Sequence, residues 1–209
     1  MNRPHQSAKR AEPVTALPFR ADRWTDTEIV RGVVNGEAPA GRALFERYHT
    51  AVSRRVRRLL GPDSECADQV QMVFEQIIAH MESLRDPEML PQWLHRITVN
   101  TVRKELRRRR RRWFLLYTPE VPDLSVSARQ ESDTAFRRAA AVLDRMKPDE
   151  RIAFVLRYVL RDEVADIARM CGWSLSTAKR RIAQARESFM CKADRDPTLR
   201  EYRETVFGG

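Results

Sequence analysis

The chain has 209 residues, with 39 Lys and Arg against 29 Asp and Glu, so its formal net charge is +10. This length allows one mid-sized domain or two small ones, and the basic balance favours polyanionic partners. The three cysteines are far apart and lack metal-ligand spacing, which argues against both a disulfide framework and a zinc site. No apolar run is long enough to span a membrane and no secretory signal is visible, so we expect a cytoplasmic protein without membrane insertion.

The N-terminal region is predicted to be a disordered leader over residues 1–24, because it contains three prolines and little hydrophobic periodicity. Order is predicted to begin at Thr25, because Thr25-Asp-Thr-Glu28 fits a capping box at the start of a helix. This short helix is expected to end near Asn35, just before a glycine.

Two longer amphipathic helices are predicted next, over 40–60 and about 64–84, because apolar residues recur there at helical spacing. In the second of them, Asp68, Gln71 and Glu75 form a polar stripe beside the apolar face. This stripe is either a solvated edge of the helix or a ridge that binds another protein. From the stripe alone, the solvated edge is favoured. The residues expected to face the core are Leu44, Phe45, Tyr48, Val52, Val56, Leu59, Val70, Val73, Phe74, Ile77, Ile78 and Met81.

A strongly basic helix is predicted to begin at Pro91. Arg96, Asn100, Arg103 and Arg107 fall on one stripe of this helix, because they are spaced by four, three and four residues. Arginine binds phosphate in any sequence, whereas the amide of asparagine offers a donor and an acceptor to a base edge. The run of six arginines over 107–112 indicates phosphate binding, and the alternative is a solvated helix end that complements the helix dipole.

The C-terminal half begins with a predicted linker over 114–135, which contains two prolines and one basic residue against four acidic ones. Short helices follow it, and Gly172 marks a break before a last helix that Ser174 caps. Residues 192–209 are predicted to form a tail. The fold class is therefore all-α, with two small helical domains joined by a flexible linker.

A helix-turn-helix is the best match to the pattern at about 163–190. Early residues on the second helix of such a motif reach base edges in the major groove of DNA. The alternative is an ordinary αα-hairpin with a solvated cationic face, and the second basic region upstream favours DNA. The residues expected on the exposed side are Ser176, Thr177, Lys179, Arg180, Arg181 and Gln184.

The order of these features resembles an extracytoplasmic-function sigma factor of the sigma-70 type, a promoter-specificity subunit of bacterial RNA polymerase. The segment Asp68-Gln-Val-Gln-Met-Val-Phe74 resembles the D-x-V-Q-E-x-F signature of region 2.2. Trp93-Leu-His-Arg-Ile-Thr-Val-Asn-Thr101 resembles the W-L-x-R-I-A-x-N stretch of regions 2.3 and 2.4. Ser176-Thr-Ala-Lys179 stands where region 4.2 has G-T-V-[RK]. The resemblance implies a region 2-like domain over 25–113 and a region 4-like domain over 136–191.

The resemblance also implies roles for individual residues. The loop 85–90 would accept a flipped base of the −10 element. The implied partners are core RNA polymerase, through its β′ clamp helices and β flap, promoter DNA and an anti-sigma factor, with no cofactor, metal or catalytic residue. The residues implied for the clamp helices are Asp68, Gln71 and Phe74; those for the unpaired −10 strand are Arg96, Asn100, Arg103, Lys104 and Arg107; those for the −35 duplex are Ser176, Thr177, Lys179, Arg180, Arg181 and Gln184.

Some residues depart from the family pattern. Met72 replaces the usual acid, and Arg161-Asp-Glu163 stands where the family has Gly-Leu-Ser. Asp162 is nevertheless able to cap the helix that follows it.

Two other functions are alternatives to a sigma factor. A stand-alone DNA-binding regulator would leave Asp68 and Gln71 without a role, and a DNA-processing enzyme ranks last because no nucleophile or metal-binding cluster is apparent.

Overall fold

The computed structural model describes residues 23–61, 65–115, 131–197 and 199–200, and these residues form helices and turns without any strand. The all-α prediction is confirmed. In the N-terminal lobe, the helices are α1 (Asp26–Val34), α2 (Ala38–Leu60), α3 (Cys66–His80) and α4 (Leu90–Leu115), with the 3-10 turns η2 (Met81–Ser83) and η3 (Pro87–Met89) between the last two. In the C-terminal lobe they are α5 (Glu131–Asp144), α6 (Pro148–Phe154), the π-helical turn η4 (Val155–Val159), α7 (Val164–Cys171) and α8 (Leu175–Ala193).

The start of α1 is held by the predicted capping box. The Thr25 hydroxyl accepts the Glu28 backbone N–H at 3.2 Å, and the Glu28 carboxylate accepts the Thr25 N–H at 2.7 Å. Asp26 then ties α1 to α2, because its carboxylate accepts hydrogen bonds from Arg47 at 2.8 Å and from the Tyr48 hydroxyl at 2.7 Å.

The boundaries of the ordered helices differ from the predicted ones. Trp24, the last residue of the predicted leader, packs against the core, and residues 1–22 lie outside the described part. Helix α4 continues to its end at Leu115 and α5 begins at Glu131, so both ends of the predicted linker are helical and its middle, 116–130, is not described. Helix α8 likewise runs two residues into the predicted tail.

Two residues predicted to face the core, Phe45 and Ile78, are exposed instead. Phe45 and Ile78 each follow a fully buried neighbour, Leu44 and Ile77. Successive residues on a helix point about 100° apart, so the neighbour of a fully buried residue can lie at the edge of the buried face and be exposed. Phe45 is 46% exposed and Ile78 is 53% exposed.

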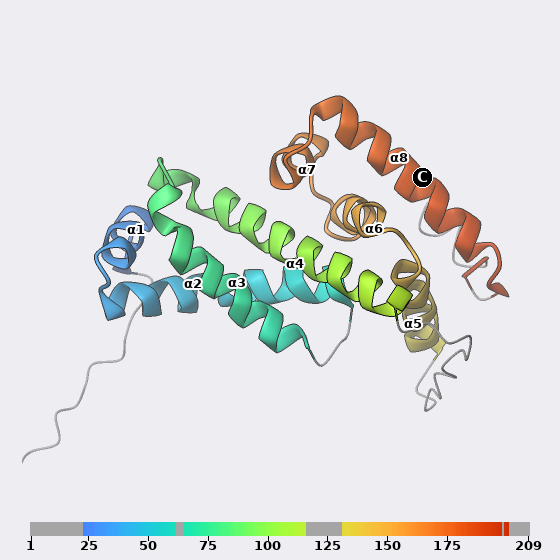
Figure 1. Cartoon of the computed structure of the whole chain (residues 1–209), viewed down its shortest axis with the longest axis horizontal. Coiled ribbons are helices and arrows are strands. Elements are labelled where there is room, and N and C mark those ends of the chain that lie inside the picture. The colour runs from blue at the N-terminus through green and yellow to red at the C-terminus, as the bar shows by residue number, and fades with distance from the viewer. Residues whose placement is uncertain (1–22, 62–64, 116–130, 198, 201–209) are drawn as a thin grey trace, which may run out of the picture.

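Helix α4 lies at the centre of the molecule (Figure 1), with α2 and α3 along one side and α6 and α7 along the other. The two predicted lobes are therefore in contact. Arg151 of α6 is 4% exposed and donates to the backbone oxygen of Leu59 on α2 at 2.7 Å. Arg55 of α2 donates to both carboxylate oxygens of Asp162, at 2.7 and 3.2 Å.

The pairing with Arg55 corrects the expected role of Asp162. The N-cap of α7 is Glu163, whose side chain makes no capping hydrogen bond. The carboxylate of Asp162 is used between the lobes because a two-pronged contact with a buried guanidinium is stronger than a single cap to a backbone N–H.

Gly32 is a position where α1 and α2 touch. A Cβ at Gly32 would lie 2.5 Å from the Cβ of Ala40, whereas a Cβ at Gly41 would meet nothing within 4 Å. We expect Gly32→Ala to lower the free energy of unfolding by about 1–3 kcal/mol, despite the better helix propensity of alanine. Gly41→Ala is expected to raise it by about 0.5–1 kcal/mol. Urea unfolding followed by circular dichroism measures both, and stabilisation by both variants would contradict this packing.

Candidate nucleic-acid interface

Helix α4 presents part of its predicted polar stripe to solvent. Val99 and Val102 are fully buried and anchor the helix, while Arg96 and Lys104 are exposed and Asn100 is half-buried. Arg103 belongs to the same stripe by spacing but points toward the C-terminal lobe. Arg96 and Lys104 thus give α4 an exposed cationic surface, and Arg103 does not share it.

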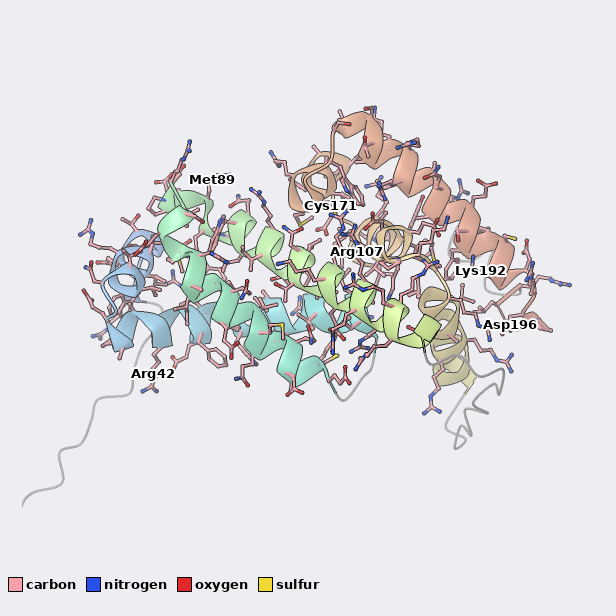
Figure 2. The ribbon with its side chains drawn as sticks, viewed as in Figure 1. Arg42, Met89, Arg107, Cys171, Lys192 and Asp196 are labelled. Carbon is pink, nitrogen blue, oxygen red and sulfur yellow. The ribbon has the colours of Figure 1, made fainter. Side chains whose placement is uncertain are left out.

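The loop before α4 is ordered by its own hydrogen bonds. The Asp86 carboxylate accepts the N–H of Glu88 at 3.0 Å and starts the turn η3. Met89 is exposed at the end of this turn. Figure 2 shows Met89 at one end of the long helix α4 and Arg107 farther along it, at the C-terminal lobe. The loop predicted to hold a flipped base is therefore well separated from the arginine run.

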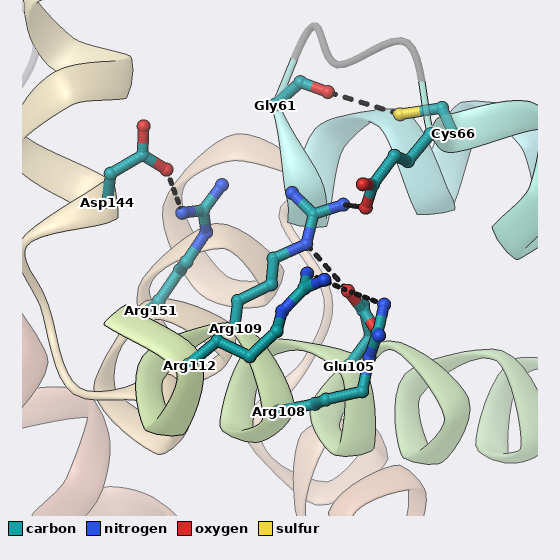
Figure 3. Close-up of polar contacts among 9 residues, drawn as sticks. Gly61, Cys66, Glu105, Arg108, Arg109, Arg112, Asp144 and Arg151 are labelled. Atoms are coloured by element: carbon teal, nitrogen blue, oxygen red, sulfur yellow. Dashed lines mark hydrogen bonds and ion pairs between the residues drawn. The ribbon is translucent and has the colours of Figure 1, made fainter. Parts of the chain in front are cut away.

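The six arginines divide into two groups on opposite sides of α4. Arg108 and Arg109 donate to the carboxylate of Glu105 at 2.6 and 2.8 Å, and Arg112 lies 3.9 Å from it (Figure 3). Arg109 also pairs with Glu65 at 2.9 Å. Burial of Glu105 tends to raise the pKa of its carboxyl, but the hydrogen bonds and charges of these arginines outweigh burial and lower that pKa. These three arginines therefore serve the fold of the N-terminal lobe.

The other arginines face a cleft between the lobes with a volume of about 930 Å³. Helix α4 contributes cations to one wall of this cleft and α8 contributes cations to the opposite wall. We call it the basic cleft. Its cationic residues are Arg107, Arg110, Arg111, Lys147, Arg180 and Arg181.

Asp149 and Glu150 at the start of α6 both line this cleft, and the carboxylate of Asp149 pairs with arginines of both walls. It accepts from Nε and a terminal nitrogen of Arg103 at 2.7 and 3.2 Å, and from Arg181 at 2.7 Å. Arg107 donates to it at 3.2 Å. Burial tends to raise the pKa of the Asp149 carboxyl, but the hydrogen bonds from Arg103 and the charges of the three arginines outweigh burial and hold that pKa below its ordinary value. Asp149 is therefore ionised at neutral pH.

The ring of Trp173 lies against two of the three arginines that pair with Asp149. The guanidinium of Arg103 lies 5.3 Å from the centre of the Trp173 ring, and that of Arg181 lies 4.7 Å from it. Both distances suit a cation–π interaction. Arg103 also donates to the backbone oxygen of Cys171 at 3.1 Å, at the meeting point of α4 and α7 where Figure 2 labels Arg107 and Cys171. Arg103 is thus fixed by a carboxylate, a ring and a carbonyl.

Helix α8 has the predicted start. Gly172 ends α7 in the left-handed conformation, with φ 67°, and the Ser174 hydroxyl accepts the N–H of Thr177 at 3.2 Å. Lys179, Arg180 and Gln184 are exposed, as a DNA-reading face requires. The hydroxyl of Thr177 also accepts a hydrogen bond from Ser174 at 2.8 Å.

Arg181 does not share the exposed face predicted for it. Arg181 follows Arg180 directly on the helix, so its side chain points in a different direction, toward α4 and Asp149. Its partner is 32 positions away in sequence, so spacing along α8 did not reveal it.

The polar stripe of α3 lies beside exposed apolar side chains. Asp68 and Gln71 are exposed, and Gln71 donates to Glu75 at 3.0 Å. Phe74 is buried, and its ring centre lies 4.9 Å from that of Phe45, which is 46% exposed. Surface apolar residues that gather in this way are typical of protein-binding sites. We call this surface the α2–α3 patch; it consists of Phe45, Asp68, Gln71, Met72 and Ile78.

Comparison with known proteins decides the family. Residues 44–112 match the model of sigma-70 region 2, and residues 136–189 match that of sigma-70 region 4. The chain is 32% identical over 176 residues to the extracytoplasmic-function RNA polymerase sigma factor SigM of Mycobacterium tuberculosis, covering 83% of this chain and 87% of that protein. The chain belongs to the extracytoplasmic-function sigma factors.

Further relatives of this sigma factor agree. It is 27% identical over 187 residues to the sigma-E factor of Escherichia coli, which covers 80% of this chain and 94% of that protein. Its fold is similar to CnrH solved in complex with the cytosolic domain of CnrY, with a TM-score of 0.56, 21% identity and coverage of 82% and 98%. It is also similar to the sigma factor RpoE of Bartonella quintana solved in complex with the anti-sigma factor NepR, with a TM-score of 0.52, 20% identity and coverage of 74% and 97%.

The two matched regions place the surfaces within the sigma factor. The region 2 match contains most of α2, all of α3 and nearly all of α4, and so holds the α2–α3 patch and the exposed part of the α4 stripe. The region 4 match contains α6, α7 and most of α8.

Neither Phe45 nor Asp149 was among the candidate site residues predicted from the sequence. The sequence offered one signal for Phe45: it directly follows Leu44, a second apolar residue on the same helix. No helix in the described ranges is both long and apolar enough to cross a membrane.

Proposed function

We propose that this sigma factor, a promoter-specific initiation subunit that binds RNA polymerase, divides DNA recognition between two helices. Helix α4 contacts the unpaired strand of the −10 element and α8 reads the −35 element as duplex. The observation that carries this proposal is the presence of exposed cations together with an amide on each helix, within two lobes that match regions 2 and 4. The chain acts in the cytoplasm and contributes no catalytic step of its own.

The α4 surface suits an unpaired strand. Arg96 and Lys104 supply charge for phosphates, and Asn100 between them supplies hydrogen bonds for a base edge. Extruding a base from the duplex costs a few kcal/mol, so binding to the extruded state favours strand opening. The exposed turn η3, at the start of the same helix, is the proposed place for the flipped base.

The α8 surface suits a major groove. Lys179 and Arg180 match the acceptors of guanine, and Gln184 one turn later matches adenine. The N-terminus of α8 is fixed by Ser174, so these side chains leave a rigid helix rather than a loop.

The α2–α3 patch is the proposed contact with the polymerase β′ clamp helices. Phe74 supports this patch from below, where it holds the ring of Phe45 in place. A second apolar surface lies on the C-terminal lobe, where Tyr158, Val164, Ile182 and Met190 line a groove of about 520 Å³. We assign this groove to the β flap. The complexes of related sigma factors with anti-sigma factors suggest a similar inhibitor for this chain.

Asn100→Ala is expected to reduce promoter opening about tenfold, because one base contact to the unpaired strand is lost. Affinity for fully paired promoter duplex is expected to stay within about twofold, because duplex is read by α8. Permanganate reactivity of unpaired thymines in the polymerase–promoter complex measures the first effect, and fluorescence anisotropy measures the second. Undiminished permanganate reactivity would contradict the role of Asn100.

Size-exclusion chromatography of the purified chain with core RNA polymerase tests the function itself. We expect the chain to elute with the polymerase in a 1:1 complex. A chain that binds promoter duplex but elutes apart from the polymerase would instead be a stand-alone regulator.

A further inference from the structure

The observed packing of the lobes is incompatible with simultaneous contact to both promoter elements. The −35 and −10 elements are about 25 base pairs apart by their names, which is about 85 Å along straight duplex at about 3.4 Å per base pair. In the structure, Arg107 of α4 and Arg181 of α8 lie 3.2 and 2.7 Å from the same carboxylate. The two lobes must therefore separate before α4 and α8 engage a promoter together.

The contact that joins the lobes resembles a contact with nucleic acid. Carboxylate and phosphate oxygens accept the same two-pronged hydrogen bonds from arginine. Asp149 accepts five hydrogen bonds from three arginines, two of which, Arg103 and Arg107, belong to the α4 stripe. Its carboxylate thus occupies arginine donors that a DNA phosphate would use.

We propose that Asp149 is an internal substitute for a DNA phosphate, which holds the lobes closed and keeps Arg103, Arg107 and Arg181 occupied until the lobes separate. This inference rests on the proposed function, because it takes α4 and α8 as the DNA-binding helices and adds Arg103, Arg107 and Arg181 to their DNA contacts once the lobes have separated. The observed affinity for DNA falls as the fraction of molecules in the closed state rises. A ligand that binds only the open state shifts the equilibrium from closed to open molecules.

Other contacts cross the same boundary, among them the hydrogen bond from Arg103 to the backbone oxygen of Cys171, and two of them involve buried arginines. Arg55 is buried and pairs with Asp162, and the guanidinium of Arg151 reaches the backbone oxygen of Leu59. When the lobes separate, these groups form hydrogen bonds with water, which offset part of the free energy lost with the contacts. The Asp149 contact differs from both, because its arginines gain phosphate as well as water on opening.

Asp149→Asn tests the proposal, and Glu150→Gln is the matched control. Both substitutions remove one negative charge from the wall of the basic cleft. The ion pair recorded for Glu150 is with Lys147 at 3.8 Å, within its own lobe. Small-angle X-ray scattering of the full chain measures the separation of the lobes. We expect the radius of gyration to increase by several ångströms for Asp149→Asn and to stay at the wild-type value for Glu150→Gln.

Affinity for a non-specific 20-base-pair duplex provides the second measurement. We expect Asp149→Asn to bind about tenfold more tightly than wild type, which corresponds to about 1.4 kcal/mol, a value between those of exposed and buried ion pairs. Glu150→Gln is expected to change affinity less than twofold. An unchanged radius of gyration for Asp149→Asn, or equal affinity gains for the two variants, would overturn the proposal. Failure of the wild-type chain to elute with core polymerase would instead overturn the proposed function, because neither measurement here involves polymerase.

Discussion

Replacing both Lys179 and Arg180 by alanine is expected to weaken binding to a −35 duplex about 100-fold. Each side chain is exposed on the first turns of α8, where a bidentate base contact contributes about 1–3 kcal/mol and a phosphate contact adds a salt-dependent share. Association with core polymerase is expected to survive, because the α2–α3 patch lies in the other lobe and Lys179 is only one of the residues that line the groove assigned to the β flap. Fluorescence anisotropy on promoter duplex, at two salt concentrations, measures the affinity and the number of phosphate contacts.

The matched control removes two cations from the second half of the same helix, at Arg186 and Lys192. We expect this double alanine variant to bind the duplex within about threefold of wild type, because residues late on a recognition helix lie away from the base edges. An equal loss in both double variants would mean that α8 supplies only net charge. Loss of polymerase binding by the Lys179 and Arg180 variant would contradict the separation of the two surfaces.

Replacing Phe45 by aspartate is expected to reduce the affinity for core polymerase by about 30-fold or more. Aromatic anchors at the centre of an interface contribute about 2 kcal/mol or more, and a charge at such a position has to be desolvated on binding. Phe45 is 46% exposed and lies at the edge of the core, so the fold of the lobe is expected to be retained, as circular dichroism would verify. Competition for polymerase with a labelled wild-type chain measures the effect.

Val34→Asp is the control for Phe45→Asp. Val34 is exposed to a similar extent, at the end of α1 rather than in the α2–α3 patch. We expect this variant to compete for polymerase as well as wild type does. Equal losses for the two variants would show that Phe45 has no particular place in the interface.

Local patterns were sufficient to predict the elements and the family. The capping box at Thr25, the break at Gly172 and the cap at Ser174 are interactions between residues within a few positions of one another, so the sequence shows them directly. The exposed cations of α4 and α8 follow from helical spacing in the same way. The ion pairs of Glu105 with Arg108 and Arg109 lie at i, i+3 and i, i+4, and this spacing was available as a signal that part of the arginine run is structural.

The contact between the lobes was beyond local patterns. Arg103 and Asp149 are 46 positions apart, and Arg55 and Asp162 are 107 positions apart. Helical spacing shows which residues share a face, but a partner on another helix decides whether that face meets solvent. Arg103 and Arg181 were therefore expected to be exposed, and the structure turns both toward Asp149.

Transcription in vitro is the most direct test of the account. Core RNA polymerase would be supplied with this chain and with fragments of the host chromosome, and the start sites and unpaired bases would be mapped by transcript sequencing and permanganate. We expect start sites that depend on the chain, each with a shared upstream duplex element and unpaired thymines about ten bases before the start. Transcripts that are the same with and without the chain would contradict the assignment of promoter recognition to α4 and α8.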